Sequence, residues 1–348
     1  MSLAAPAVAS VAADFPAFEP FPGLSGGHAQ TIVARYLPGR LMRDPAVRHE
    51  LETGDGDRLA VLESTPPAWA ASAPSVLLVH GLGGCAESPY VVRVAHRLYE
   101  CGARVVRMNL RGAGSGFGLA RGSYHAGRTG DLRVVAEWMA RRAPESPIAL
   151  VGFSLGANLV LKLAAEAASE RLAGLDCVVA ANPPLDLSAG CRFLQRPGAK
   201  LYDRNFVRLL HEHVRRFESR FPDAPAIDLS KAGTLYDFDN HVTAPRNGFR
   251  DAEHYYSESS SGPLLGRIEV DGLVVHALDD PFIPPEPFHS FEFPPRIRLD
   301  LQEHGGHLGF LDRRKFGGDR RWLDARITTW LSARWATNPA LASTVPSH

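Results

Sequence analysis

The stretch VGFSLGANLVLK, residues 151–162, decides the fold. An apolar run typical of a strand leads into Gly-Phe-Ser-Leu-Gly, and a run with helical character follows. Glycines at positions 152 and 156 suit a sharp turn from strand to helix, where larger side chains would collide with neighbouring backbone. Such a turn places the hydroxyl of Ser154 above the end of the strand. The pattern predicts a nucleophilic serine, and the plainer alternative is a serine that only caps a helix.

Short β-rich runs alternate with helical periodicity from about residue 46 onward. VRHELET and LAVLEST, around the turn GDGD, predict a leading antiparallel pair. The apolar runs that follow predict parallel strands covered on both faces, at 75–81, 103–110, 147–154, 175–183, 272–280 and 296–304. Helices are expected over 88–101, 130–143, 155–169 and 321–335. This alternation indicates a doubly wound, mostly parallel sheet that binds ligands beyond the carboxyl ends of its strands.

One connection breaks this rhythm. About 85 residues, from Pro184 to roughly Ile268, separate LDCVVAANP from GLVVHALDD, far more than an ordinary loop needs. The segment contains a helical stretch, NFVRLLHEHVRRFESRF, and then a polar, aromatic part. We therefore expect a cap inserted over the edge of the sheet that carries the active site.

A serine hydroxyl needs a positioned base, and EHGGHLGFLD offers two histidines just after the final strand candidate. In the chain order nucleophile, acid, histidine, the base lies on the loop that follows the last strand. His307 is flanked by glycines that let this loop approach Ser154, so it is favoured over His304.

The acid that orients the histidine is expected at the end of the strand before last, where Asp279 and Asp280 are adjacent in HALDDPFIP. Alternating side chains cannot both face the histidine loop. Asp280 is followed by Phe282, Ile283 and Pro284, a spacing that the family resemblance described below favours for the acid. Asp279 is expected to cap the turn by bonding nearby backbone N–H groups.

Two backbone N–H groups are expected to stabilise a developing oxyanion. One belongs to Leu155, directly after the serine. The other is assigned to Leu82, in the HGLGG loop after the first apolar strand, with Gly81 and Gly83 shaping the loop.

Other classes of site fit the sequence poorly. The glycine-rich turn NLRGAGSGFG has the spacing GxGxGxG instead of GxGxxG, which argues against a dinucleotide site. His211 and His213 lack the HExxH spacing of a zinc site and are expected on a solvated helix face. A Ser-Lys mechanism is disfavoured because Lys162 lies two turns from Ser154. No metal or organic cofactor is therefore expected.

Composition limits the partners and the compartment. The 348 residues carry zero formal net charge, so no basic field is available to hold nucleic acid. The four cysteines are scattered, which favours a reducing cytoplasm. The apolar start has no basic n-region, and no apolar run reaches the length of a membrane span, although peripheral contact with lipid stays open.

The chain resembles the α/β-hydrolase superfamily, and more narrowly its YheT-like subfamily, over roughly residues 18–335. The stretches that carry the resemblance are HAQTI, HGLGG, SPYV, NLRGAGSG, RGSYHAGRTGDL, VGFSLGANLVLK, TAPRNGF with the tyrosine pair that follows, ALDDPFIP and GGHLGF. The patterns YHxGxTxDL and GFSLGxNxxLK are features of the subfamily more than of the superfamily.

This resemblance implies an α/β-hydrolase domain over residues 18–335, with about eight strands and a cap at about 184–268 between strands six and seven. Residues 1–17 and 336–348 are expected to be flexible ends. The nucleophile, acid and base would correspond to Ser154, Asp280 and His307. Tyr124, His125 and Asp131 are expected to stabilise the loop beneath the site. The residues expected to contact substrate are Gly81, Phe153, Phe249, Tyr255 and Tyr256, with packing as the alternative for the aromatic ones.

The function expected from these features is hydrolysis of small-molecule acyl esters through an acyl-enzyme. Two alternatives remain open at this stage. The acyl group could pass to an alcohol instead of water, or the fold could serve as a binding protein without turnover. The sequence leaves the acyl chain length and the alcohol group undetermined.

Overall fold

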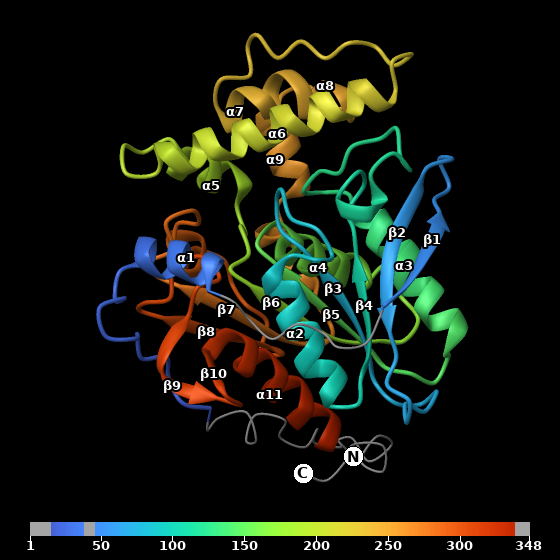
Figure 1. The fold of residues 1–348 in the computed structure, drawn as a ribbon, viewed down its shortest axis with the longest axis vertical. Coiled ribbons are helices and arrows are strands. Elements are labelled where there is room, and N and C mark those ends of the chain that lie inside the picture. The colour runs from blue at the N-terminus through green and yellow to red at the C-terminus, as the bar shows by residue number, and fades with distance from the viewer. Residues whose placement is uncertain (1–14, 38–45, 338–348) are drawn as a thin grey trace.

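The computed structural model describes residues 15–37 and 46–337, and its centre is a twisted sheet of eight strands (Figure 1). The strands lie in the order β1-β2-β4-β3-β5-β6-β7-β8. Neighbours from β4 to β8 are parallel, whereas β2 pairs antiparallel with both β1 and β4. The bounds are Val47–Glu52 (β1), Arg58–Ser64 (β2), Ser75–Val79 (β3), Arg104–Met108 (β4), Ile148–Phe153 (β5), Leu175–Ala181 (β6), Asp271–Ala277 (β7) and Ile297–Gln302 (β8). The predicted α/β sheet and its leading antiparallel pair are confirmed.

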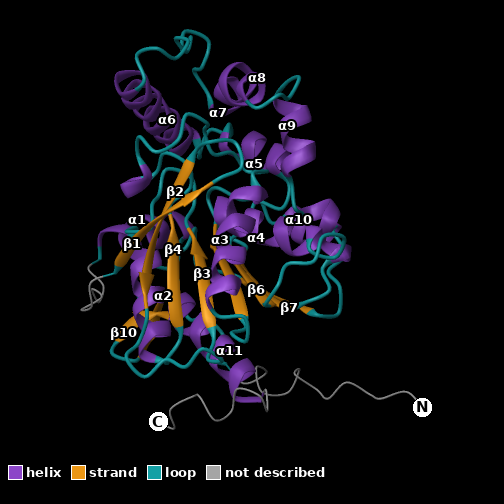
Figure 2. Ribbon diagram, turned by 90° about the vertical axis from the view of Figure 1, so that its right-hand side faces the viewer, coloured by secondary structure: helices purple, strands orange, loops and turns teal. Residues whose placement is uncertain are grey.

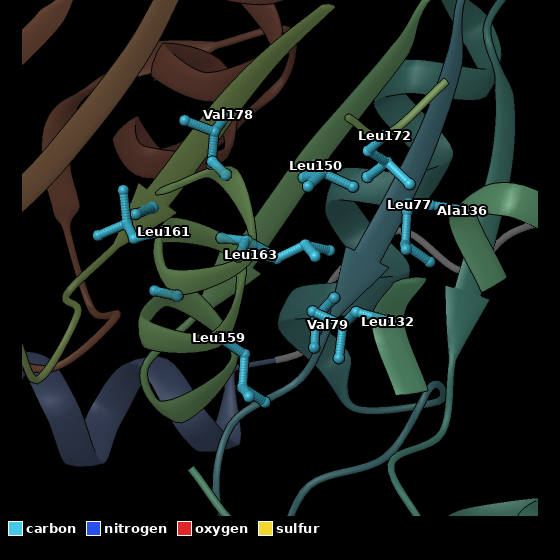
Figure 3. Close-up of a cluster of buried hydrophobic side chains, with 14 of the residues drawn as sticks. Leu77, Val79, Leu132, Ala136, Leu150, Leu159, Leu161, Leu163, Leu172 and Val178 are labelled. Carbon is cyan, nitrogen blue, oxygen red and sulfur yellow. The ribbon is translucent and has the colours of Figure 1, made fainter. Parts of the chain in front are cut away.

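Side chains alternate along each buried strand, so apolar side chains project from both faces of the sheet. Helices cover both faces and bury these side chains. Leu77 and Val79 of β3 point into the core beneath α3 (Thr129–Arg142) and α4 (Leu155–Glu166), and Figure 3 shows these side chains meeting. Val76 and Leu78 point to the opposite core, which α2 (Pro89–Glu100) and α11 (Trp322–Thr337) cover. The other helices outside the cap are α1 (Gly27–Tyr36) and α10 (Glu286–Ser290), with the short turn η1 (Gly114–Gly116).

The cap lies between β6 and β7, as predicted, and stands over the carboxyl ends of the strands (Figures 1 and 2). It consists of α5 (Leu187–Leu194), α6 (Lys200–Arg220), α7 (Leu235–Phe238), the π-helix η2 (Asp239–Thr243), α8 (Ala244–Arg246) and α9 (Ala252–Ser259). The turn η3 (Gly262–Arg267) falls inside the predicted cap bounds of 184–268. Leu265 and Ile268, however, pack in the core beside α4, so this part belongs to the body beneath the cap.

The two ends of the described chain pack on the domain. Phe15 stacks on Phe316, with ring centroids 5.6 Å apart, and meets the edge of Trp322. Residues 15–17 therefore contact the fold, in contrast to the predicted flexible segment 1–17. Residues 336 and 337 of the predicted tail end α11. The predictions for 1–14 and 338–348 lie outside the described residues. The hairpin of β9 (Leu311–Phe316) and β10 (Asp319–Arg321) leads into α11.

Helix α4 approaches the sheet closely at Gly156. A Cβ atom added there would lie 2.3 Å from the carbonyl oxygen of Val79 in β3. One added at Gly152 would lie 2.2 Å from the carbonyl oxygen of Gly156. The two glycines of the quoted stretch therefore let β5 turn directly into a helix that rests on its neighbouring strand.

We expect Gly156→Ala to lower the free energy of unfolding by about 1–3 kcal/mol, because the added methyl forces α4 away from β3. Gly130→Ala is the matched control, since nothing lies within 4 Å of a Cβ atom there. This control replaces a helical glycine and should leave stability unchanged or raise it by up to about 1 kcal/mol. Urea unfolding measures both variants. Equal stability of the two would contradict the close approach.

Candidate active site

Ser154 lies between β5 and α4 in a left-handed backbone conformation, with φ 53° and ψ −121°. This conformation is strained for a residue with a side chain, and such strain is found mostly at functional sites. The backbone N–H of Ser154 donates to Ala181 O at 2.9 Å, which ties the turn to the end of β6. The predicted sharp turn from strand to helix is therefore present.

Asp280 and His307 are brought together by the ends of β7 and β8. His307 Nδ1 lies 2.8 Å from Asp280 Oδ2. A carboxylate only accepts hydrogen bonds, so the hydrogen is on Nδ1 and Nε2 is left free to accept a proton. Phe282 packs on the His307 ring, with centroids 4.4 Å apart, and borders the same cavity as Ser154.

The carboxylate of Asp280 is completely enclosed and accepts three further hydrogen bonds. Asn182 Nδ2 donates to Oδ2 at 2.7 Å, and the N–H groups of Phe282 and Ile283 donate to Oδ1 at 2.8 and 3.2 Å. Burial raises the pKa of Asp280, but the charge and hydrogen bond of His307 and the donor at Phe282 outweigh it. The net pKa therefore lies below its ordinary value, and Asp280 is charged at neutral pH.

The structure corrects the role expected for Asp279. The N–H groups of the turn bond to Asp280, whereas Asp279 Oδ1 accepts the N–H of Gly306 at 2.8 Å and Oδ2 lies 3.3 Å from His304 Nδ1. The two adjacent acids point in different directions, so Asp279 bonds backbone in the histidine loop and not in its own turn. His304 is bound by Asp279 on the surface, while His307 is enclosed.

Two residues that hold this region were not identified from the sequence. Asn182, at φ 48°, also donates to Gly306 O at 3.3 Å and so joins the acid to the histidine loop. Thr31 of α1 accepts the backbone N–H of His307 at 2.8 Å. The only signals were an asparagine at a strand end and the HAQTI stretch, whose partners lie 98 or more residues away in the chain.

The loop after β3 presents one backbone donor without a partner. Gly81 N–H donates to Tyr90 Oη at 3.0 Å, and Gly83 N–H donates to Tyr124 Oη at 3.1 Å. Between them, the N–H of Leu82 has no acceptor among the described residues. A Cβ atom at Gly81 would lie 2.9 Å from Ser154 Cβ, so this loop runs directly beside the serine.

The residues expected beneath the site hold this loop and its neighbour. Tyr124 supports Gly83 directly, as described. Asp131 binds Arg111 through both carboxylate oxygens, at 2.8 Å each. His125 Nδ1 accepts the N–H of Gly127 within its own loop at 3.2 Å. A further support is His80, which accepts the N–H of Leu110 at 3.1 Å.

A mostly apolar cavity lies between the sheet and the cap and reaches Ser154 and Leu82. Tyr255 and Tyr256 line it, as expected. Phe153 does not, because its side chain points into the core on the opposite face of the sheet and packs on Tyr90. Phe249 packs behind the wall against His125 and Tyr255. His213, expected on a solvated helix face, instead borders the cavity.

Metal and membrane features are limited. Within residues 15–37 and 46–337, no three His, Cys, Asp or Glu side chains are grouped so that they could hold a metal ion. In the same part of the chain, no helix is both long and apolar enough to cross a membrane.

Comparisons with known proteins identify the family of the chain. The family model described as "alpha/beta hydrolase fold" matches residues 74–314. YheT of Escherichia coli K12, named as a candidate esterase, is 31% identical over 90% of this chain and 93% of its own length. A monoacylglycerol lipase of Saccharomyces cerevisiae is 28% identical over 74% of this chain, which spans 59% of that lipase. Phospholipase ABHD3 of Homo sapiens is 25% identical, over 82% of this chain and 71% of its own length.

Solved structures share the fold at low identity. The Pyrococcus furiosus esterase Pf2001 superposes with a TM-score of 0.56 at 16% identity, covering 92% of this chain and 98% of the esterase. A 2,6-dihydroxy-pseudo-oxynicotine hydrolase gives a TM-score of 0.57 at 18% identity, covering 92% of this chain and 74% of the hydrolase. The family model and the similarity to YheT over nearly the whole length show that the chain belongs to the α/β-hydrolase family and is YheT-like.

Proposed function

We propose that the protein is a serine hydrolase of carboxylic acyl esters. The observations that carry the proposal are the strained turn at Ser154, the loop of Leu82 beside it and the Asp280–His307 hydrogen bond, all of which follow the carboxyl ends of parallel strands in one sheet. The names of its relatives, which include an esterase, a lipase and a phospholipase, support an ester as substrate.

In this mechanism Ser154 Oγ attacks the ester carbonyl while His307 Nε2 takes its proton. His307 then returns that proton to the leaving alcohol, and water releases the acyl group from the acyl-enzyme in a second, equivalent step. Asp280 holds the histidine in the required tautomer. The N–H groups of Leu82 and of Leu155, the first residue of α4, stabilise the oxyanion. No metal or organic cofactor enters these steps.

The apolar cavity favours one variation on this reaction. A cap that limits the access of water lets an alcohol compete for the acyl-enzyme, so transfer to an alcohol is a second candidate reaction. Product analysis with added ethanol distinguishes hydrolysis from transfer to an alcohol.

The four cysteines are free thiols, which supports the proposal that the enzyme works in the reducing cytoplasm.

Ser154→Ala is expected to lower turnover of a short p-nitrophenyl ester on the order of 10⁶-fold, because the nucleophile is removed. The fold should remain intact, as judged by circular dichroism. A fluorophosphonate probe should label the parent protein and leave the variant unlabelled. Turnover by the variant at the parent rate would exclude the mechanism. A parent protein that is folded but neither labelled nor active would indicate a binding protein.

The adjacent acids should respond differently to the same isosteric change. Asp280→Asn is expected to lower turnover about 10⁴-fold, since the histidine loses the partner that fixes its tautomer. Asp279→Asn should leave turnover within a few-fold and lower the free energy of unfolding by about 1–3 kcal/mol, because the N–H of Gly306 loses a charged acceptor. Kinetics and urea unfolding of both variants measure this. Equal losses of turnover would show that the acid is misassigned.

Asn182→Gly removes the amide that holds Asp280 while preserving the freedom to adopt a positive φ. We expect turnover to fall about tenfold through loss of one charge-assisted hydrogen bond. The pKa of Asp280, held below its ordinary value, should rise. The acid limb of the pH–rate profile should therefore move to higher pH. A purely structural role would lower stability without moving that limb.

A further inference from the structure

The cavity that reaches Ser154 is lined mostly by apolar side chains, among them Phe206, Leu210 and Phe217 of α6. A few polar side chains also line it, including Asp239 and the tyrosines 124, 255 and 256. An acyl chain gains nothing from a carboxylate, so Asp239 suits a group that forms hydrogen bonds.

Asp239 is an acidic residue that lines this cavity. Its side chain is nine-tenths buried, and it begins the π-helix η2. Thr243 Oγ1 donates to Oδ1 at 2.7 Å, and Tyr256 Oη donates to Oδ2 at 2.8 Å. An ionised carboxylate can accept about four hydrogen bonds, so each oxygen retains capacity. No Lys or Arg of the described chain forms an ion pair with it.

A second buried carboxylate in the cap shows what a purely structural acid looks like here. Asp203 of α6 accepts the backbone N–H of Leu235 at 3.0 Å and does not border the cavity. Asp239 instead bonds only to side chains, faces the cavity and lies on a π-helical turn, a feature found frequently at functional sites. Asp239 therefore differs from Asp203 in its hydrogen-bond partners, in its exposure to the cavity and in the helix type on which it lies.

We propose that Asp239 accepts a hydrogen bond from a hydroxyl group of the substrate and so selects hydroxyl-bearing esters. This inference rests on the proposed ester hydrolysis and names a specificity determinant for it. A hydroxyl suits the site better than an ammonium group, because the guanidinium of Arg246 lines the same cavity and disfavours a second cation. The hydroxyl belongs either to the alcohol part or to the acyl part of the ester.

The ionisation state of Asp239 suits a group that accepts a hydrogen bond from a substrate hydroxyl. Burial raises the pKa of Asp239 to about 6, against the hydrogen bonds from Thr243 and Tyr256, so the group is mostly ionised at neutral pH. Burial also raises the pKa of Tyr124, Cys191 and Tyr256, so all three stay protonated as Asp239 titrates. Burial and the charge of Arg216 lower the pKa of His213, which favours its neutral form.

Pairs of isosteric esters that differ only by a hydroxyl in place of a methyl test the proposal. Hydroxyethyl and propyl octanoate probe the alcohol part, and ethyl ω-hydroxyoctanoate and ethyl nonanoate probe the acyl part. In one pair, Asp239→Asn should lower the ratio of kcat/KM for the hydroxylated ester to that for its partner by about tenfold. The matched control Asp203→Asn should leave both ratios at the parent values.

The parent protein provides a test that needs no variant. In the pair that responds, the ratio should fall as the pH drops through about 6, because Asp239 loses its charge. Effects of pH that are common to both esters cancel in the ratio. Fluorophosphonate labelling establishes that each variant is folded and competent. Ratios independent of both Asp239 and pH would overturn the inference. A parent protein that cleaves none of the four esters would refute the proposed function instead.

Discussion

The carboxylate of Asp280 is the interaction on which the arrangement of this site depends. It is fully enclosed, yet it accepts hydrogen bonds from His307, Asn182, Phe282 and Ile283. A buried charge is tolerated only when such donors replace its lost hydration. Satisfying it therefore ties the end of β6, the turn after β7 and the loop after β8 to one point.

A second constraint on the site is the close approach of α4 to β3. Ser154 has a positive φ at the start of this helix, and the Gly81 loop runs directly beside the serine. The hydrogen bonds of Gly81 to Tyr90 and of Gly83 to Tyr124 then fix the loop while Leu82 keeps its N–H free. Rigid strands thus position the serine, and ordinary hydrogen bonds orient the groups around it.

The cap contributes the surface that a substrate meets, and it is linked to the base. Tyr202 and Phe206 of α6 both pack edge-on against Phe282, which in turn packs on His307. Tyr202 Oη also lies 2.8 Å from His28 Nδ1 at the start of α1. Helix α6, which lines the cavity, is therefore in contact, through the ring of Phe282, with the residue that we propose as the base.

The sequence by itself determined the strands, the main helices, the turn at Ser154, the place of the cap and the choice of Asp280 over Asp279 as partner of His307. These predictions follow from local periodicity, from glycines at positions where another backbone segment passes close by, and from the order of the motifs along the chain. All three can be recognised in the sequence without knowledge of the fold. Only the tertiary structure decided that Phe153 faces the opposite core, that His213 borders the cavity, that Asp279 holds Gly306, and that Asn182 and Thr31 support the site. Each of these depends on contacts between segments far apart in the chain, since the direction of a side chain and the partner of a polar group are set by packing that no local pattern records.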